Sequence, residues 1–346
     1  SAAAQRFEVP VLPAFNFNAL TPANAEGLNT IVDGPALLMN HRDDEAHNPG
    51  TNDPSQDFLD LYTLDINWAD PTQSQLAGPT SIPIGEFDSH LCGYLVANVC
   101  FPQPGTGQLL DPVREVIMNR LVYRQFEDYA SLVGSFVTDV DGTDHGGVRW
   151  FELRKTNGFW FLYQEGTYAP DSAHRWISSS SVDGDGNILL GYNITDASSI
   201  FPGLRFNGRY AQDPPGVFTL GENNIVEGTA AATTSRWGDY AGASLDPEDE
   251  RTFWFTGQYQ AALWATRIIS LRLCDPPPAP TNLQAVANGT NRIDLTWTSA
   301  NSKVAIYRAE DTCPAPGAFQ KIAGPLTAAS YSDLNASGGT TYAYFV

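Results

Sequence analysis

Residues 176–192 decide the fold; they read WISSSSV, then DGDGN, then ILLGY. The two outer pieces carry tryptophan, isoleucine, valine, leucine and tyrosine, which β-strands favour. The five residues between them, 183–187, are aspartate, glycine and asparagine, which tolerate the backbone angles of a tight turn. The pattern predicts two antiparallel strands joined by a hairpin.

The same pattern continues on both sides of this hairpin. Aromatic residues make up 12% of the 346-residue chain, and its 30 glycines and 24 prolines suit short strands joined by turns. Few windows keep the spacing of a helix. The sequence therefore predicts an all-β chain. Beyond the hairpin, strands are expected at residues 117–123, 130–137, 148–153, 159–163, 203–206, 217–220, 240–245, 252–259 and 265–273.

The strands group into units of about 50–60 residues, the size of four-stranded propeller blades. His174-Arg175-Trp176 and Ser235-Arg236-Trp237 open two successive units, and an earlier unit covers residues 35–83. These units predict a β-propeller-like domain over residues 1–274. About four blades are visible, the last with three strands. Either residues 7–12 supply the strand that closes the propeller, or the domain is part of a larger propeller that begins upstream of Ser1.

A proline-rich segment, DPPPAP at residues 275–280, reads as a stiff linker. Residues 281–346 then show short alternating strands, with Trp297 in the second of them. Leu334 followed by Tyr342 matches a tyrosine corner. This segment resembles a fibronectin type III module, a small β-sandwich. The last strand of such a module is missing after Val346, so the chain is expected to continue.

Four stretches, 120–124, 147–154, 163–171 and 236–240, together resemble a family of large secreted bacterial proteins, mostly uncharacterised. In that family a propeller-like domain is often followed by fibronectin type III modules. The resemblance covers roughly residues 30–275 and implies export and a role at the cell surface. It implies no particular reaction.

Net charge and cysteine content restrict which partners and which cellular location are expected. The formal net charge of −20 disfavours nucleic acid and anionic membranes, and no run approaches the ~18 apolar residues of a membrane span. Cys92 and Cys100 are close enough to predict a disulfide, which favours an extracellular setting. The partners of Cys274 and Cys313 stay open.

The first candidate chemistry is that of a carbohydrate-active hydrolase, a sialidase-like glycosidase with its site at the mouth of the propeller channel. Arginines could bind a sugar carboxylate, beside a nucleophile and an acid. The arginines available to bind this carboxylate are residues 120, 124, 175, 205 and 236. The candidate catalytic residues are Arg120, Arg175, Arg236, Glu165, Asp239 and Tyr240. Because Arg-Trp and Asp-Tyr pairs recur in successive units, a packing role competes with catalysis.

The second candidate is a structural calcium ion, the only cofactor expected, if there is one. Asp183, Asp185 and Asn187 alternate as oxygen ligands, but the twelfth position of a complete EF-hand loop would fall on Ile194, which cannot bind the ion. The sequence favours a non-enzymatic protein over an enzyme. The preferred function is extracellular binding, adhesion or assembly, with a cell-surface, filament or glycan partner, and the hydrolase is the alternative.

Overall fold

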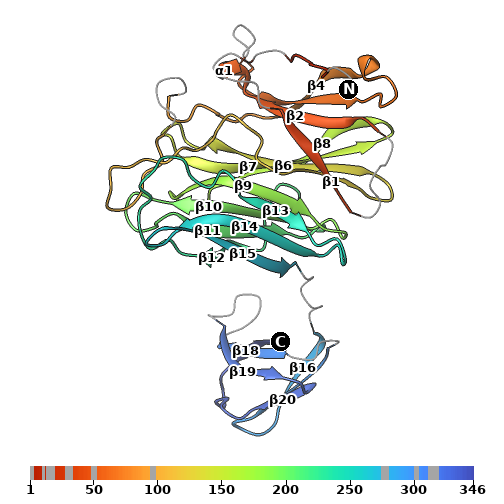
Figure 1. The fold of residues 1–346 in the computed structure, drawn as a ribbon. Helices are drawn as coiled ribbons and strands as arrows, with labels where there is room; N and C mark the ends of the chain where they lie inside the picture. Colours follow the sequence, from red (N-terminus) through yellow and green to blue (C-terminus); the bar gives the residue numbers. More distant parts are fainter. Residues whose placement is uncertain are drawn as a thin grey trace. The chain divides into compact units, whose positions relative to one another are not determined.

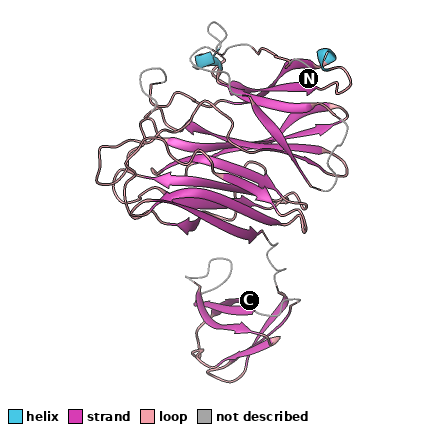
Figure 2. Cartoon of the chain, viewed as in Figure 1, coloured by secondary structure: helices cyan, strands magenta, loops and turns pink. Residues whose placement is uncertain are grey.

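The computed structural model describes residues 4–9, 12, 20–27, 34–47, 53–93, 99–273, 280–299, 304–310 and 319–346. The chain forms two compact units, Ser1–Leu273 and Cys274–Val346. Both consist almost entirely of strands, so the prediction of an all-β chain is confirmed (Figure 2). Within the described residues the helical elements are one short α-helix, α1 (Asp44–His47), and one 3-10 turn, η1 (Pro71–Gln73).

The first unit begins with an eight-stranded sheet in the order β4-β3-β2-β1-β5-β6-β7-β8. Neighbouring strands are antiparallel except β1 and β5, which run parallel with Glu26 opposite Arg124. Its strands are β1 (Thr21–Glu26), β2 (Ala36–Arg42), β3 (Gln56–Asp65), β4 (Gln75–Gly85), β5 (Leu121–Gln125), β6 (Ala130–Asp139), β7 (Gly146–Thr156) and β8 (Phe159–Tyr168).

Two smaller antiparallel sheets complete this unit, in the orders β12-β11-β10-β9 and β13-β14-β15. The opening hairpin forms as predicted, because β9 and β10 pair from Ile188 opposite Val182. The strand predicted at 217–220 is wrong: Val217 is exposed, and the strand lies after it, as β12. The strands are β9 (His174–Val182), β10 (Ile188–Thr195), β11 (Gly203–Arg209), β12 (Asn223–Val226), β13 (Gly242–Leu245), β14 (Thr252–Gln260) and β15 (Trp264–Arg272).

The sheets pack in chain order, as successive layers in Figure 1. The large sheet folds on itself, so that apolar side chains of β2–β4 such as Leu59 pack against those of β5–β7 such as Phe151. The strands of this unit form four groups in chain order: β1–β4, β5–β8, β9–β12 and β13–β15. Trp176 and Leu189 of the third group pack against Phe253 and Phe255 of the fourth. Burial of these continuous apolar surfaces is the main favourable term in the folding of the unit.

The first strands of the four groups lie side by side. β1 pairs with β5. The hydroxyl of Ser179 in β9 accepts hydrogen bonds from the backbone N–H of Arg120, next to β5 (3.2 Å), and of Ala243 in β13 (2.8 Å). β9 carries four consecutive buried serines, residues 178–181. Their small side chains allow close approach of these strands, and the hydroxyl groups of Ser178, Ser179 and Ser181 also form hydrogen bonds.

Between β4 and β5 the chain makes a long connection that contains the predicted disulfide. Cys92 and Cys100 are bonded, with their Cα atoms 5.2 Å apart. This confirms the pairing proposed from their spacing. Cys274 and Cys313, and all of the 275–280 linker except Pro280, lie outside the described residues.

The second unit consists of two three-stranded sheets, β16-β17-β20 and β19-β18-β21. Leu295 and Trp297 of one sheet and Ile306 of the other form its buried core. The strands are β16 (Thr281–Ala287), β17 (Ile293–Thr298), β18 (Val304–Glu310), β19 (Gln320–Leu326), β20 (Ser330–Asp333) and β21 (Tyr342–Phe345).

Candidate functional site

Charged side chains gather where the first strands of the sheets meet. Because β1 and β5 are parallel, Glu26 at the end of β1 lies beside Arg124 near the end of β5. Ser181, near the end of β9, donates a hydrogen bond to Glu26 Oε2 (3.0 Å). We call Glu26, Arg120, Arg124, Ser181 and Glu250 the first-strand cluster.

Glu26 is the most enclosed carboxyl group of the first-strand cluster. Its Oε1 accepts hydrogen bonds from Arg120 Nη1 (2.9 Å) and Asn24 Nδ2 (3.3 Å). Burial raises the pKa of Glu26, and the hydrogen bond from Ser181 and the charges of Arg120 and Arg124 only partly offset this effect. A carboxyl group that keeps its proton to higher pH than usual can act as a general acid.

Arg124 connects this carboxyl group to a second one. Its Nη2 donates to Glu250 Oε2 (2.8 Å), and Glu250 lies in the turn between β13 and β14. The backbone carbonyl of Glu250 also accepts from the N–H of Gly184, in the opening hairpin (2.7 Å). Strands from three sheets therefore hold two carboxyl groups beside one guanidinium.

The guanidinium of Arg124 is buried and only partly bonded. The side chain is 5% exposed. Nε and Nη1 have no hydrogen-bond acceptor among the residues that the structure describes. Buried donors are nearly always paired in folded proteins, so this pair of nitrogens requires an explanation.

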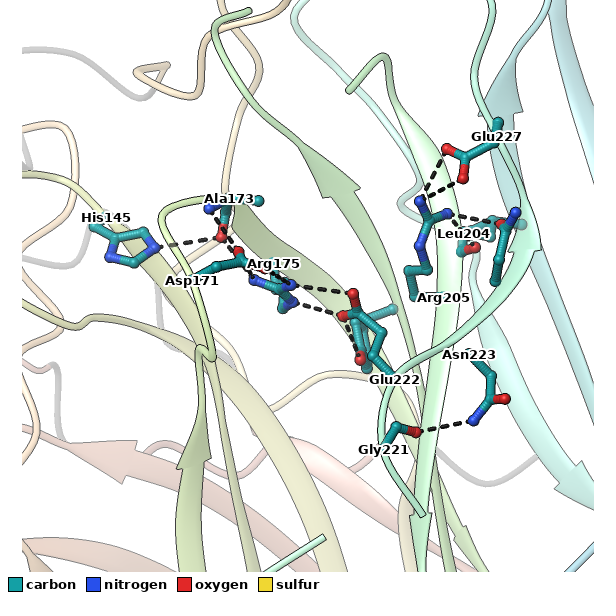
Figure 3. A network of polar contacts seen from close by, with 12 residues as sticks. His145, Asp171, Ala173, Arg175, Leu204, Arg205, Gly221, Glu222, Asn223 and Glu227 are labelled. Atoms are coloured by element: carbon teal, nitrogen blue, oxygen red, sulfur yellow. Dashed lines mark hydrogen bonds and ion pairs between the residues drawn. The ribbon is translucent and has the colours of Figure 1, made fainter. Parts of the chain in front are cut away.

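Arg175, a predicted catalytic residue, lies in a different and fully satisfied network (Figure 3). Its Nε and Nη2 donate to Glu222 (2.7 and 3.1 Å), and its Nη1 and Nη2 donate to Asp171 (2.8 and 3.0 Å). Tyr192 also donates to Glu222 (2.8 Å). Because the Arg175 side chain is 0% exposed and its donors are occupied, it holds β9 to neighbouring segments.

Glu165 holds the two ends of the folded eight-stranded sheet together. Its Oε1 accepts from the N–H of Gly85, at the end of β4 (2.7 Å), and its Oε2 accepts from Arg149 (2.5 Å). Arg149 also donates to the carbonyl of Gly85 (2.9 Å). The interactions of Glu165 thus connect β4 to β7 and β8, away from the first-strand cluster.

Arg236, Asp239 and Tyr240 form a local arrangement before β13. Arg236 Nε donates to Asp239 Oδ2 (2.9 Å), three residues along the chain. Tyr240 is 95% exposed. Of the six predicted catalytic residues, only Arg120 lies in the first-strand cluster.

The predicted calcium ligands form a hydrogen-bonded turn. Asp183 Oδ1 accepts from the N–H groups of Asp185 (2.9 Å) and Asn187 (2.8 Å), and its Oδ2 accepts from Asn187 Nδ2 (2.8 Å). Asp185 pairs with Arg251. These bonds account for the shape of the turn, and calcium binding here stays a prediction.

A second acidic group was not expected from the sequence. One carboxylate oxygen from each of Asp43, Glu45 and Asp57 lies within 4.8 Å of the others. Asp57 accepts hydrogen bonds from the N–H groups of Asp44 (2.8 Å) and Phe87 (2.9 Å). Burial raises the pKa of Asp57 to about 7.

Comparisons with known proteins found neither a protein-family profile nor a curated protein that matches this chain. Among solved structures, an α-L-arabinofuranosidase from Fusarium graminearum matches 74% of this chain and 76% of its own, at 12% identity and a TM-score of 0.30. An α-L-arabinanase from Penicillium chrysogenum matches 76% and 67%, at 12% identity and a TM-score of 0.32. A Dyadobacter fermentans protein of unknown function matches 83% and 92%, at 13% identity and a TM-score of 0.29. These scores are too low to support an argument about fold or activity.

No helix in the described part of the chain is long and apolar enough to cross a membrane.

Proposed function

We propose that this protein is an exported carbohydrate-active hydrolase whose active site is the first-strand cluster. The observation that carries the proposal is the pair of carboxyl groups beside Arg124. Glu26 is buried with a raised pKa, and Glu250 is held by a hydrogen bond from the guanidinium. The hydrolase was the alternative from the sequence, and this geometry favours it over adhesion.

Glycoside hydrolysis needs one carboxyl group that gives a proton and a second that activates water or attacks the sugar. Glu26 is assigned the first role because burial retains its proton. Glu250 is assigned the second. In the proposed step the glycosidic C–O bond breaks and the departing oxygen takes the proton of Glu26. The oxygen of a water molecule bonds to the anomeric carbon, and the proton of that water passes to Glu250.

The test is hydrolysis of a panel of neutral and acidic polysaccharides, followed by the release of reducing ends. Glu26→Gln and Glu250→Gln should each lower kcat by about 100-fold or more, the usual effect of losing acid or base catalysis. Glu227→Gln is the matched control, because Glu227 pairs with Arg205 outside the cluster. The rate should fall as pH rises above the raised pKa of Glu26. Absence of turnover on the whole panel, or a normal rate for Glu26→Gln, would refute the assignment.

We also propose that the first unit is β-propeller-like, with its four groups of strands as blades, and that the second is a fibronectin type III-like module. The adjacent first strands support the former. The hydroxyl of Tyr342 accepts a hydrogen bond from the N–H of Ser337 (3.1 Å), as a tyrosine corner would.

The Cys92–Cys100 disulfide supports a location outside the cell.

Binding without turnover is the second candidate. Trp68, Phe159 and Trp264 are largely exposed, and aromatic rings of this kind can stack on sugars. The ion pairs of Arg175 and Arg236 lie within their own sheet or loop, as expected for packing. A glycan array that gives binding, followed by no hydrolysis of any bound glycan, would favour this candidate.

A further inference from the structure

We propose that Arg124, together with Arg120, binds the carboxylate of an acidic sugar, so that the substrate is a uronic acid-containing glycan. This inference rests on the proposed function, because it assigns the substrate class of the same cluster. It begins from the two nitrogens of Arg124, Nε and Nη1, that have no acceptor among the described residues.

Two other buried arginines of this unit, Arg175 and Arg205, form more hydrogen bonds than Arg124 does. Arg175 places all three guanidinium nitrogens on carboxylate or carbonyl oxygens. Arg205 donates through Nη2 to both oxygens of Glu227 (2.8 and 2.9 Å) and through Nη1 to Asn224 (2.8 Å). The bonding of Arg124 is less complete than that of Arg175 and Arg205. Nε of Arg149 also has no acceptor among the described residues, but Arg124 has two such nitrogens. The two unpaired nitrogens of Arg124 indicate that an acceptor from outside the chain completes its hydrogen bonds.

Two glycines keep side chains away from this guanidinium. A Cβ atom at Gly27 would lie 3.0 Å from Arg124 Cζ and 3.1 Å from Nη1. A Cβ atom at Gly184 would lie 3.2 Å from Nη2. The ring of Phe126 lies 5.5 Å from Arg124 Cζ. Any larger residue at positions 27 or 184 would crowd the guanidinium against its surroundings.

The chemistry of the donors selects a carboxylate. A guanidinium presents planar donors that match the two oxygens of a carboxylate, and such charge-assisted hydrogen bonds are stronger than neutral ones. Arg120, at the start of β5, is one-third exposed and adds a second positive charge near Glu26. When Glu26 is protonated, the carboxylate that balances the charge of Arg120 is lost, and the two arginines can accept an anion from outside the chain.

Binding of the carboxylate and protonation of Glu26 should therefore be linked. Two carboxylates beside the same arginines repel each other, so a bound uronate favours the protonated form of Glu26. Affinity for the acidic sugar is expected to rise as pH falls toward the raised pKa of Glu26. A neutral sugar should lack this dependence.

The experiment is calorimetric titration of the full chain with three trimeric uronides, of galacturonate, mannuronate and glucuronate, each beside its carboxyl-reduced neutral counterpart. At least one uronide should bind about tenfold or more tightly than its neutral counterpart, the ratio expected for one charge-assisted hydrogen bond. Arg124→Met should bring this ratio close to one, and Arg124→Lys should restore only part of it. Arg205→Met is the matched control and should keep the full ratio.

Arg120→Gln, at a more exposed position, tests the same site if Arg124→Met does not fold, and should lower the ratio in the same way. The inference is overturned if no uronide is preferred, or if the preference survives in both Arg124→Lys and Arg120→Gln. Preferential uronide binding without hydrolysis would support the uronate-binding site and refute the proposed hydrolase activity. Hydrolysis of neutral glycans alone would support the hydrolase activity and refute the uronate-binding site.

Discussion

Replacing Arg175 or Arg124 with methionine compares two buried arginines that differ in how many hydrogen bonds they make. Arg175 donates five hydrogen bonds, to Glu222, Asp171 and the carbonyl of Ala173. Arg124 donates a hydrogen bond to Glu250 and leaves two nitrogens unpaired among the described residues. If satisfied arginines are structural and unsatisfied ones functional, Arg175→Met should lower stability and Arg124→Met should lower ligand binding.

The cost of Arg175→Met follows from what the substitution leaves behind. Glu222 keeps the hydrogen bond from Tyr192 but loses its buried cation, and an uncompensated buried charge typically costs about 3–5 kcal/mol. The lower end of this energy range applies because the Glu222 side chain is 21% exposed. Asp171, whose side chain is 58% exposed, adds little to the cost because water stabilises its charge. We expect a loss of about 3 kcal/mol, which lowers the Tm of the first unit by roughly 6–12 °C.

Adding Glu222→Gln to Arg175→Met removes the unpaired charge of Glu222 while keeping an acceptor for the hydroxyl of Tyr192. The double variant should regain about 1–2 kcal/mol of the lost stability. Arg124→Met leaves Glu250, whose side chain is 22% exposed, without its cation, but it also removes two buried donors that have no acceptor among the described residues. Because the second effect offsets part of the first, the loss of stability should be smaller than for Arg175→Met, about 1 kcal/mol.

Thermal unfolding followed by tryptophan fluorescence can measure these differences. Seven of the eight tryptophans, all except Trp297, precede residue 274, so the signal reports mainly on the first unit. The reasoning is refuted if Arg124→Met destabilises the unit as much as Arg175→Met. It is also refuted if Glu222→Gln adds to the loss instead of restoring stability.

Two further predictions concern the disulfide and pH. Replacing Cys92 and Cys100 with serine opens a loop with a sequence separation of 8 and should cost about 2.5 kcal/mol by loop entropy; an unchanged urea midpoint would contradict this. The folded state holds the proton of Asp57 up to a pKa of about 7, whereas the unfolded chain loses it near pH 4, so the contribution of Asp57 to stability falls as pH rises from about 4 to about 7. Burial lowers the pKa of His41 to about 3 and those of His47 and His174 to about 4, which acts in the opposite direction, so the test compares the parent chain with Asp57→Asn at pH 5 and pH 8. The parent chain should lose more stability than Asp57→Asn between these two pH values, and an equal or smaller loss would contradict the prediction.

The fold was predictable where strands are apolar and turns are polar. The hairpin of β9 and β10 formed within two or three residues of its expected ends. β1 was not expected, because its sequence, TPANAE, has little β-propensity and no apolar alternation. It forms a strand because β2 and β5 pair with it on both sides. Such a strand is determined by tertiary contacts that no local pattern shows.

The candidate site was predictable only in part, for the same reason. Arg120 is predicted as one of several arginines that could bind a sugar carboxylate, and it does lie in the first-strand cluster. Glu26 was missed because it belongs to β1, and Glu250 because it follows a turn that was recognised only as a turn. Their proximity depends on the parallel β1–β5 pairing and on the contact between Gly184 and Glu250.

Recurrence along the sequence pointed to packing residues. His174-Arg175-Trp176 and Ser235-Arg236-Trp237 place two tryptophans in one buried core, where they have the same role. The arginines beside them share no environment: the side chain of Arg175 is fully buried, and that of Arg236 is mostly exposed. Trp176 lies within β9 and Trp237 in the loop before β13, so the repeated motif indicates a shared apolar packing role rather than a shared position in a strand. A ligand site has to differ from sheet to sheet, because one ligand meets each sheet with a different part of its surface. The residues of the first-strand cluster fit this requirement, since a carboxyl group, two arginines, a serine and a second carboxyl group come from segments that do not resemble one another.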